Sequence, residues 1–199
     1  MHKSNSTDSL FPFKAVFLGS STVGKTSIVN AIMNNKYLEE QQPTIGACFA
    51  IKKIEINDHI IRVNLWDTAG QERFRSLAPM YYRDANFALI TFAVNDIDSF
   101  EATKKWYEGI VADCQTLPKI ILIGNKIDLD KERVVSNEEG ENLAKKFGAV
   151  YIEVSAKTKE NIEKFIEKIG ELAATELDSP VIVNEVIENN IEAKDKGCC

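Results

Sequence analysis

The sequence is short of histidine, tryptophan and cysteine, and it has no excess of basic residues. Its 199 residues include 2 His, 2 Trp and 4 Cys, and 24 Lys and Arg stand against 30 Asp and Glu, a net charge of -6. Binding to nucleic acid through phosphates needs clustered basic side chains, so this composition argues against a nucleic-acid partner. The length suits one globular domain with a short appendage.

The cysteines do not form a disulfide framework. Cys198 and Cys199 are adjacent, and Cys48 and Cys114 stand alone among ordinary residues. Residues 1–10 are polar and lack the apolar stretch of a signal peptide, and no run of about eighteen apolar residues is present. We therefore expect a protein of the reducing cytosol.

Short apolar runs that alternate with helical patterns indicate an α/β fold. Strand patterns apolar on both faces, as in parallel sheets covered by helices, occupy residues 13–18, 87–94, 119–124 and 149–154. Residues 49–56 and 60–66 are joined at Asn57-Asp58 and predict a hairpin. We expect six strands in a mostly parallel sheet, with one antiparallel edge strand and helices on both faces.

Two helices are predicted by their caps and spacing. Ser136-Asn-Glu-Glu139 predicts a capping box, and Gly148 predicts the end of the same helix. Behind Thr158, an apolar stripe at helical spacing comprises Ile162, Phe165, Ile166, Ile169 and Leu172. Residues 36–47 and 68–79 show neither the helical nor the strand periodicity of apolar residues, and we expect them to be functional loops.

The composition divides the chain into three parts. We expect a flexible N-terminus over residues 1–10, a folded domain over 11–176 and a flexible tail over 177–199. Between residues 178 and 197 there are five acidic residues, two lysines and no aromatic residue. Such a composition cannot bury enough apolar surface to fold by itself.

The segment Gly19-Ser-Ser-Thr-Val-Gly-Lys-Thr26 follows a predicted strand and opens a predicted helix, which is the setting of a phosphate-binding loop. Its backbone N–H groups would face the anion, Lys25 would reach the outer phosphates, and the Thr26 hydroxyl would bind Mg²⁺. The alternative is an ordinary turn with a solvated lysine. Because kinases, ATPases and GTPases share this loop, it predicts a ligand that carries phosphates but does not identify the base of that ligand.

The base is indicated by Asn125-Lys-Ile-Asp128, which follows an apolar strand at the carboxyl end of the sheet, where ligands bind. The Asp128 carboxylate can accept hydrogen bonds from N1–H and the exocyclic amine of guanine, whereas adenine offers no such donor pair. Taken alone, the pattern also occurs in ordinary turns.

Together with Asp67-Thr-Ala-Gly-Gln71 and Ser155-Ala-Lys157, these two segments resemble the motifs of Ras-superfamily small GTPases over residues 13–174. The resemblance implies a P-loop GTPase domain that binds GTP or GDP with Mg²⁺ and hydrolyses GTP. The nucleotide-binding set implied by it is Ser21, Thr22, Val23, Gly24, Lys25, Thr26, Ser27, Tyr37, Thr44, Asp67, Gly70, Asn125, Lys126, Asp128, Leu129, Ser155, Ala156 and Lys157.

The resemblance also implies roles around the base. Asn125 would hold the base and the ribose-side loop, and Lys126 would stack its stem on the purine. The Ala156 N–H would donate to the guanine oxygen, and Tyr37 would lie against the other edge of the base. The alternative for Tyr37 is an ordinary loop aromatic.

Around the phosphates, the implied metal ligands are Thr26, Thr44 and, through a water, Asp67. Gly70 would donate its N–H to the γ-phosphate, and Gln71 would be the catalytic residue that orients the attacking water. Thr44 would engage only when the γ-phosphate is present. Hydrolysis would therefore release Thr44 and Gly70 and change the exposed surface of both loops.

Further segments resemble the Rab branch and, among its members, the early-endosomal ones: Ile45-Gly-Ala-Cys-Phe49, Arg62-Val-Asn-Leu-Trp66, Arg73-Phe-Arg-Ser76 and Tyr81-Tyr-Arg-Asp-Ala85. Phe49, Trp66 and Tyr81 match the aromatic triad that this branch presents to effectors. The alternative is three core aromatics. Since no arginine finger is evident in the chain, we expect a GTPase-activating protein, and also a nucleotide exchange factor and GTP-dependent effectors.

The ending Gly197-Cys-Cys199 resembles the Rab terminus in which two cysteines, here Cys198 and Cys199, carry geranylgeranyl groups. Two lipid chains anchor a protein stably to a membrane, whereas one lipid chain gives only marginal, reversible binding. The resemblance thus implies escort and GDP-dissociation inhibitor proteins, and a location in the cytosol and on the cytoplasmic face of endosomal or vesicle membranes. The alternative is an unmodified end with two free thiols.

Two other functions remain open at this point. A nucleotide-dependent scaffold that hardly hydrolyses would share the fold, but Gln71 argues against it. A P-loop kinase or ATPase would share the phosphate loop, but Asp128 argues against it.

Overall fold

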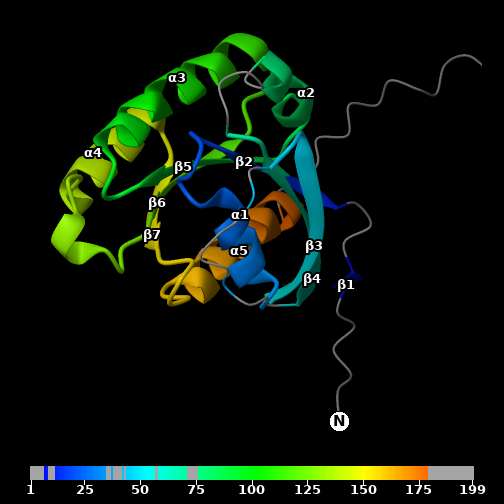
Figure 1. Ribbon diagram of the computed structural model, residues 1–199. Coiled ribbons are helices and arrows are strands. Elements are labelled where there is room, and N and C mark those ends of the chain that lie inside the picture. The colour runs from blue at the N-terminus through cyan, green and yellow to red at the C-terminus, as the bar shows by residue number, and fades with distance from the viewer. Residues whose placement is uncertain are drawn as a thin grey trace, which may run out of the picture.

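The computed structural model describes residues 7–8, 12–34, 37, 42, 44–56, 58–70 and 76–178. Within these residues, a seven-stranded sheet is covered by helices on both faces (Figure 1). The strands are β1 Thr7–Asp8, β2 Phe13–Leu18, β3 Ala47–Ile56, β4 His59–Thr68, β5 Phe87–Ala93, β6 Lys119–Asn125 and β7 Val150–Val154.

The sheet has the predicted mostly parallel topology. Its long strands lie in the order β3-β4-β2-β5-β6-β7, and β3 pairs antiparallel with β4 while the other neighbours are parallel. Strand β1 is a two-residue addition that pairs with the start of β4, in line with β2. Strand β5 is buried along its whole length, as its apolar sequence predicts for a central strand covered on both faces.

The helices are α1 Lys25–Ile32, α2 Ala78–Tyr82, α3 Ile97–Asp113, α4 Asn137–Phe147 and α5 Ile162–Asp178, with a 3-10 helix η2 at Asp130–Glu132. The predicted capping box is confirmed, because Glu139 N–H donates to the Ser136 hydroxyl and the Glu139 carboxylate accepts from Ser136 N–H at 2.8 Å. Gly148 ends α4 with a φ of 61°. None of the described helices has both the length and the apolar character needed to cross a bilayer.

The sheet separates two hydrophobic layers (Figure 1). Helices α1 and α5 cover one face, and their buried side chains include Ile28, Val29, Phe165 and Ile169. Helices α2, α3 and α4 cover the other face, and their buried side chains include Tyr82, Trp106, Ile110 and Leu143. The stripe predicted for α5 is therefore the face that it buries.

The two ends of the domain differ from the predicted boundaries. Residues 1–10 were expected to be flexible throughout, but Thr7–Asp8 form β1. The tail was expected to begin at residue 177, but α5 continues to Asp178, whose Oδ1 lies 3.0 Å from Nε2 of His59. Both segments contact the start of β4, and local composition does not reveal such long-range contacts.

The topology brings four separate motifs to one edge of the sheet. Strands β2, β4, β6 and β7 belong to one parallel set, so their carboxyl ends lie on the same side. Gly19 follows β2, Asp67 lies near the end of β4, Asn125 ends β6 and Ser155 follows β7. This edge is where ligands bind in open α/β sheets.

Candidate nucleotide-binding site

A cavity of about 420 Å³ opens at this edge. It is lined by Ser21, Thr22, Gly24, Lys25, Thr26, Ser27, Tyr37, Gln42, Thr44, Thr68, Gly70, Asn125, Lys126, Asp128, Leu129, Ala156 and Lys157. Most of the predicted nucleotide-binding residues thus lie around one space. Val23, Asp67 and Ser155 do not line it and are instead buried beside it in the protein.

The phosphate loop requires a glycine immediately before α1. Gly24 has a φ of 95°, and a Cβ built on it would lie 2.3 Å from Nδ2 of Asn125. Any side chain here would clash with the base-side loop and would also strain the backbone. Helix α1 then begins at Lys25 without a side-chain cap, so its first N–H groups remain available to an anion in the cavity.

Lys25 places a buried ammonium beside the cavity. Lys25 is 5% exposed, and its Nζ donates to the carbonyl oxygens of Gly19 and Ser20, both at 2.8 Å. Burial lowers the pKa of Lys25 to about 8, and the nearby Asp67 carboxylate opposes this shift. An anion in the cavity would balance the positive charge of this buried ammonium. The close approach also explains Gly70, where a Cβ would lie 2.4 Å from Nζ.

Three side-chain oxygens converge next to Lys25. Thr26 donates to Oδ2 of Asp67 at 2.6 Å, and the Thr44 hydroxyl lies 3.0 Å from that of Thr26 and 3.4 Å from Oδ2. Burial raises the pKa of Asp67, although the hydroxyl of Thr26, the charge of Lys25 and the hydroxyl of Thr44 oppose the shift. Among the described residues, buried Oδ1 of Asp67 has no hydrogen-bond partner.

This oxygen set fits Mg²⁺. Magnesium prefers hard oxygen ligands, and it commonly binds through one carboxylate together with substrate phosphates and waters. The unpartnered Oδ1 of Asp67 costs free energy as it stands, and a hydrated cation would satisfy it. Thr26, Thr44 and Asp67 are therefore chemically suited to the metal role predicted for them.

The base side of the cavity is built from hydrogen bonds between its own loops. Asn125 Nδ2 donates to the carbonyl of Val23 at 2.8 Å, and Oδ1 accepts from Ala156 N–H at 3.1 Å. The Ser155 hydroxyl donates to Oδ1 of Asp128 at 2.6 Å. Asn125 thus joins the phosphate loop to the loop after β7, and Ser155 fixes the carboxylate that is predicted to read guanine.

Other predicted residues fall at the margin of the cavity or outside the described part of the chain. Tyr37 is 40% exposed and lines the cavity. The predicted catalytic residue Gln71 lies outside the described residues, as do Cys198 and Cys199. Their roles stay predictions.

The aromatic triad forms one cluster next to the site. The ring centroids of Phe49 and Trp66 are 5.2 Å apart, and those of Trp66 and Tyr81 are 5.9 Å apart. Phe49 is 49% exposed, whereas Trp66 and Tyr81 are half-buried against the layer of α2, α3 and α4. Nζ of Lys14 lies 5.7 Å from the Trp66 ring. The cluster therefore connects the core to the surface.

Two cavity residues were absent from the predicted set. Thr68 lies inside the Asp67-Thr-Ala-Gly motif and donates to the carbonyl of Phe17 at 2.6 Å, so a closer reading of that motif could have included it. Gln42 belongs to a segment without periodicity or a recognisable motif. No pattern in the sequence marked Gln42.

A phosphate loop, a Thr-Thr-Asp oxygen set and an Asn-Lys-x-Asp loop around one cavity define the P-loop GTPase class. A family model described as "Ras family" matches residues 14–175. The chain belongs to the Ras family. It is 37% identical to "Ras-related protein Rab-5A" of Dictyostelium discoideum in an alignment of 199 positions that covers 98% of this chain and 99% of the relative.

The chain is accordingly a small GTPase of the Rab branch. It binds GTP and GDP with Mg²⁺, hydrolyses GTP to GDP, and regulates endosomal vesicle trafficking. Membership of this family implies an exchange factor, a GTPase-activating protein, effectors and a GDP-dissociation inhibitor as partner classes.

Proposed function

We propose that this chain is a membrane-anchored switch in which the γ-phosphate of GTP holds two loops together through Thr44 and Gly70. The observation that carries the proposal is the position of Thr44. Its hydroxyl lies 3.0 Å from that of Thr26, although Thr26 is at the start of α1 and Thr44 lies beyond its end. A ligand bound by Thr26 could therefore also reach Thr44, and removing that ligand would release the loop.

In the proposed mechanism, Thr26, Thr44 and, through a water, Asp67 would hold Mg²⁺, which would supply positive charge to the phosphates when bound. Lys25 donates to the outer phosphate oxygens, and the Gly70 N–H donates to the γ-phosphate. Gln71 orients a water whose oxygen bonds to the γ-phosphorus while the bond to the bridging oxygen of GDP breaks. The water's protons end on inorganic phosphate and solvent.

The proposed base contacts follow the geometry of the loops. Asp128 accepts from N1–H and the 2-amino group of guanine, and Lys126 stacks on the ring. Ala156 N–H, which donates to Oδ1 of Asn125 in the structure, would turn to the guanine oxygen, while Nδ2 of Asn125 keeps its hydrogen bond to the Val23 carbonyl. Ser21, Thr22, Val23, Gly24, Ser27, Tyr37, Leu129, Ser155 and Lys157 complete the proposed nucleotide site.

The proposed anchor is a pair of geranylgeranyl groups on Cys198 and Cys199, each joined by a thioether. Burying a methylene in a bilayer contributes about 0.8 kcal/mol, and stable anchoring generally needs two signals. The two chains supply both signals. Escort and GDP-dissociation inhibitor proteins would cover these chains in the cytosol, and the anchored protein would act on the cytoplasmic face of endosomal membranes.

The proposed effector surface is the aromatic cluster of Phe49, Trp66 and Tyr81. Large aromatic side chains carry much of the energy of protein interfaces. Phe49 lies on β3, the strand that follows Thr44, and its neighbour Trp66 lies on β4, the strand that precedes Gly70. A change at the γ-phosphate would therefore alter the surroundings of this surface.

Single-turnover phosphate release from preloaded protein tests the enzymatic part of the proposal. We expect slow hydrolysis of GTP, on the order of 10⁻⁴ s⁻¹ without a partner, and a rate at least about tenfold lower with Gln71→Leu. GDP affinity should be the same in both proteins. Equal rates in both proteins would remove Gln71 from the mechanism.

Two further measurements test the proposed effector surface and the proposed lipid anchor. Phe49→Ala should abolish GTP-dependent capture of effectors from a cytosolic extract while hydrolysis continues at the original rate.

Mass measurement of the protein from its own cells should show two geranylgeranyl groups on the final peptide. An unmodified peptide would contradict the proposed anchor.

A further inference from the structure

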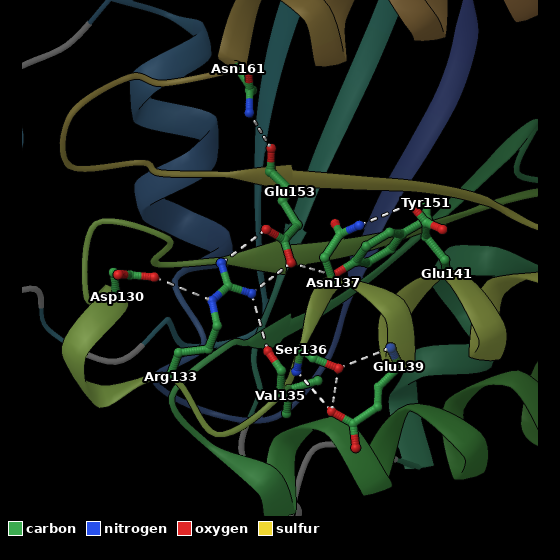
Figure 2. Close-up of polar contacts among 10 residues, drawn as sticks. All are labelled: Asp130, Arg133, Val135, Ser136, Asn137, Glu139, Glu141, Tyr151, Glu153 and Asn161. Carbon is green, nitrogen blue, oxygen red and sulfur yellow. Dashed lines mark hydrogen bonds and ion pairs between the residues drawn. The ribbon is translucent and has the colours of Figure 1, made fainter.

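Behind the base-binding loops, Arg133 and Glu153 form a bidentate ion pair (Figure 2). Nη1 of Arg133 lies 2.8 Å from Oε1 of Glu153, and Nη2 lies 3.0 Å from Oε2. The two side chains are 22% and 14% exposed, so water screens this pair less than it screens a surface pair. The hydrogen bond to Glu153 is the main reason that the pKa of Arg133 is raised.

The two partners flank the two loops that carry the proposed base contacts. Glu153 lies in β7, two residues before Ser155. Arg133 follows η2, the short helix that continues from Leu129 at the cavity. Arg133 also donates to the carbonyl of Val135 at 3.1 Å, and its Nε lies 3.8 Å from Asp130. Its guanidinium therefore holds its own loop in shape while it pairs with β7.

Glu153 is itself held in a fixed position. The Tyr151 hydroxyl donates to Oε1 of Glu153 at 2.8 Å, and Nδ2 of Asn161 donates to the Glu153 carbonyl at 3.0 Å. Tyr151 packs closely under α4, because a Cβ on Gly140 would lie 2.2 Å from its ring. The ion pair thus attaches the base-binding loop to an anchor that the sheet and α4 hold in place.

We propose that Arg133 and Glu153 are positioning residues for guanine selectivity. At the cavity, the two loops are joined by the hydrogen bond from Ser155 to Asp128 and by that from Ala156 N–H to Asn125. The ion pair adds a further link behind them, so that the Asp128 carboxylate cannot tilt away from the edge of the base. The inference rests on the proposed role of Asp128 in reading guanine.

The physical reason for such a support is the geometry of base recognition. Asp128 must present its carboxylate to two donors of guanine at once, and paired hydrogen bonds weaken together when the carboxylate rotates. Inosine diphosphate lacks the 2-amino group and offers only N1–H. Loosening the loop should therefore harm binding of GDP more than binding of inosine diphosphate.

The test compares the wild-type protein with the double variant Arg133→Met/Glu153→Gln. The double change removes both charges together, which avoids leaving one buried charge unpaired, and the amide oxygen of the new glutamine would still accept from Tyr151. Lys168→Met/Glu171→Gln is the matched control, since these residues form an ion pair at 2.5 Å on the exposed face of α5. Circular dichroism of the nucleotide-saturated proteins verifies the fold.

Competition against a fluorescent guanine nucleotide then gives the dissociation constants of GDP, inosine diphosphate, GMP and ADP. We expect the preference for GDP over inosine diphosphate to fall about tenfold in the double variant, the effect of losing about 1.4 kcal/mol. The preference for GDP over GMP, which reports the phosphate side, should be retained. Arg133→Lys, which loses the bidentate geometry, should lie between wild type and the double variant.

The outcomes separate this inference from the proposed function. An unchanged preference for GDP over inosine diphosphate in the double variant overturns the positioning role, even if all nucleotides bind more weakly. An equal loss in the Lys168→Met/Glu171→Gln control overturns it as well. If the wild-type protein itself binds ADP as tightly as GDP, the guanine function of Asp128 fails, and the positioning role fails with it.

Discussion

The two halves of the nucleotide cavity differ in how complete they are. On the base side, Asn125, Asp128, Ser155 and Ala156 are hydrogen-bonded to the protein at distances between 2.6 and 3.1 Å. On the phosphate side, Oδ1 of Asp67 lacks a partner among the described residues, and burial lowers the pKa of Lys25. The base half is formed by the protein, whereas the phosphate half needs the charges of its ligand.

This difference suits a switch that holds GDP and GTP in turn. Both nucleotides carry the same guanine, so a base site that is already formed can serve both states without change. The two nucleotides differ only in the γ-phosphate. A conformational change can be driven only by the part of the ligand that differs, and that part meets the incomplete half.

The largest expected effect concerns the base half. Asp128→Asn replaces a double acceptor with one acceptor and one donor, and the donor faces the 2-amino group of guanine. We expect the preference for GDP over xanthosine diphosphate, which has a carbonyl at that position, to fall by roughly 10⁴. Competition binding measures it, with Asp98→Asn on the exposed start of α3 as the control. An unchanged preference would mean that Asp128 does not read the base.

The next effect concerns the phosphate half. Lys25→Met removes the buried ammonium while keeping the length of the side chain. Breaking a buried charge pair costs about 3–5 kcal/mol, so GDP should bind roughly 10²- to 4 × 10³-fold more weakly. Guanosine, which lacks phosphates, should bind as it does to wild type, and calorimetry measures both ligands. Equal losses for GDP and guanosine would contradict the separation of the two halves.

A smaller change at Gly70 should affect the triphosphate state most. In Gly70→Ala the new Cβ would lie 2.5 Å from the Ser20 carbonyl oxygen, which belongs to the backbone and cannot move aside easily. We expect single-turnover hydrolysis to slow about tenfold, the cost of about 1.4 kcal/mol in transition-state stabilisation. The preference for GDP over ADP should persist, and its loss would show that Gly70 also supports the base half.

The smallest effect tests redundancy in the base half. Ser155→Ala removes the hydrogen bond to Asp128 but leaves the Arg133–Glu153 pair behind it. One neutral donor to a carboxylate contributes about 1 kcal/mol, so GDP should bind about fivefold more weakly. The dissociation rate of a fluorescent GDP measures this. A loss of several hundredfold would show that Ser155 alone holds the loop.

The sequence predicted the features that depend on short segments. The phosphate loop, the hairpin and the capping box of α4 are each formed by one continuous stretch of the chain, so their local chemistry can be recognised without the fold. Gly24 and Asp128 could be placed because strand patterns imply that carboxyl ends meet at one edge. Most of the cavity could therefore be predicted.

The features that sequence reasoning missed depend on contacts between distant residues. Arg133 and Glu153 are ordinary charged residues in the sequence, and only the packing of β7 beside the base-binding loop makes them partners. Strand β1 forms because the start of β4 extends beyond β2. Gln42 has no motif, and the role of Gln71 still rests on the resemblance.

Hydrogen exchange of the GDP complex and of the complex with a non-hydrolysable GTP analogue tests the central claim most directly. We predict that amides near Thr44 and Gly70 exchange more slowly with the triphosphate, while those in residues 125–129 and 153–157 exchange equally in both complexes. Identical exchange at Thr44 and Gly70 in the two complexes, or an equal change in both halves of the cavity, would contradict the account.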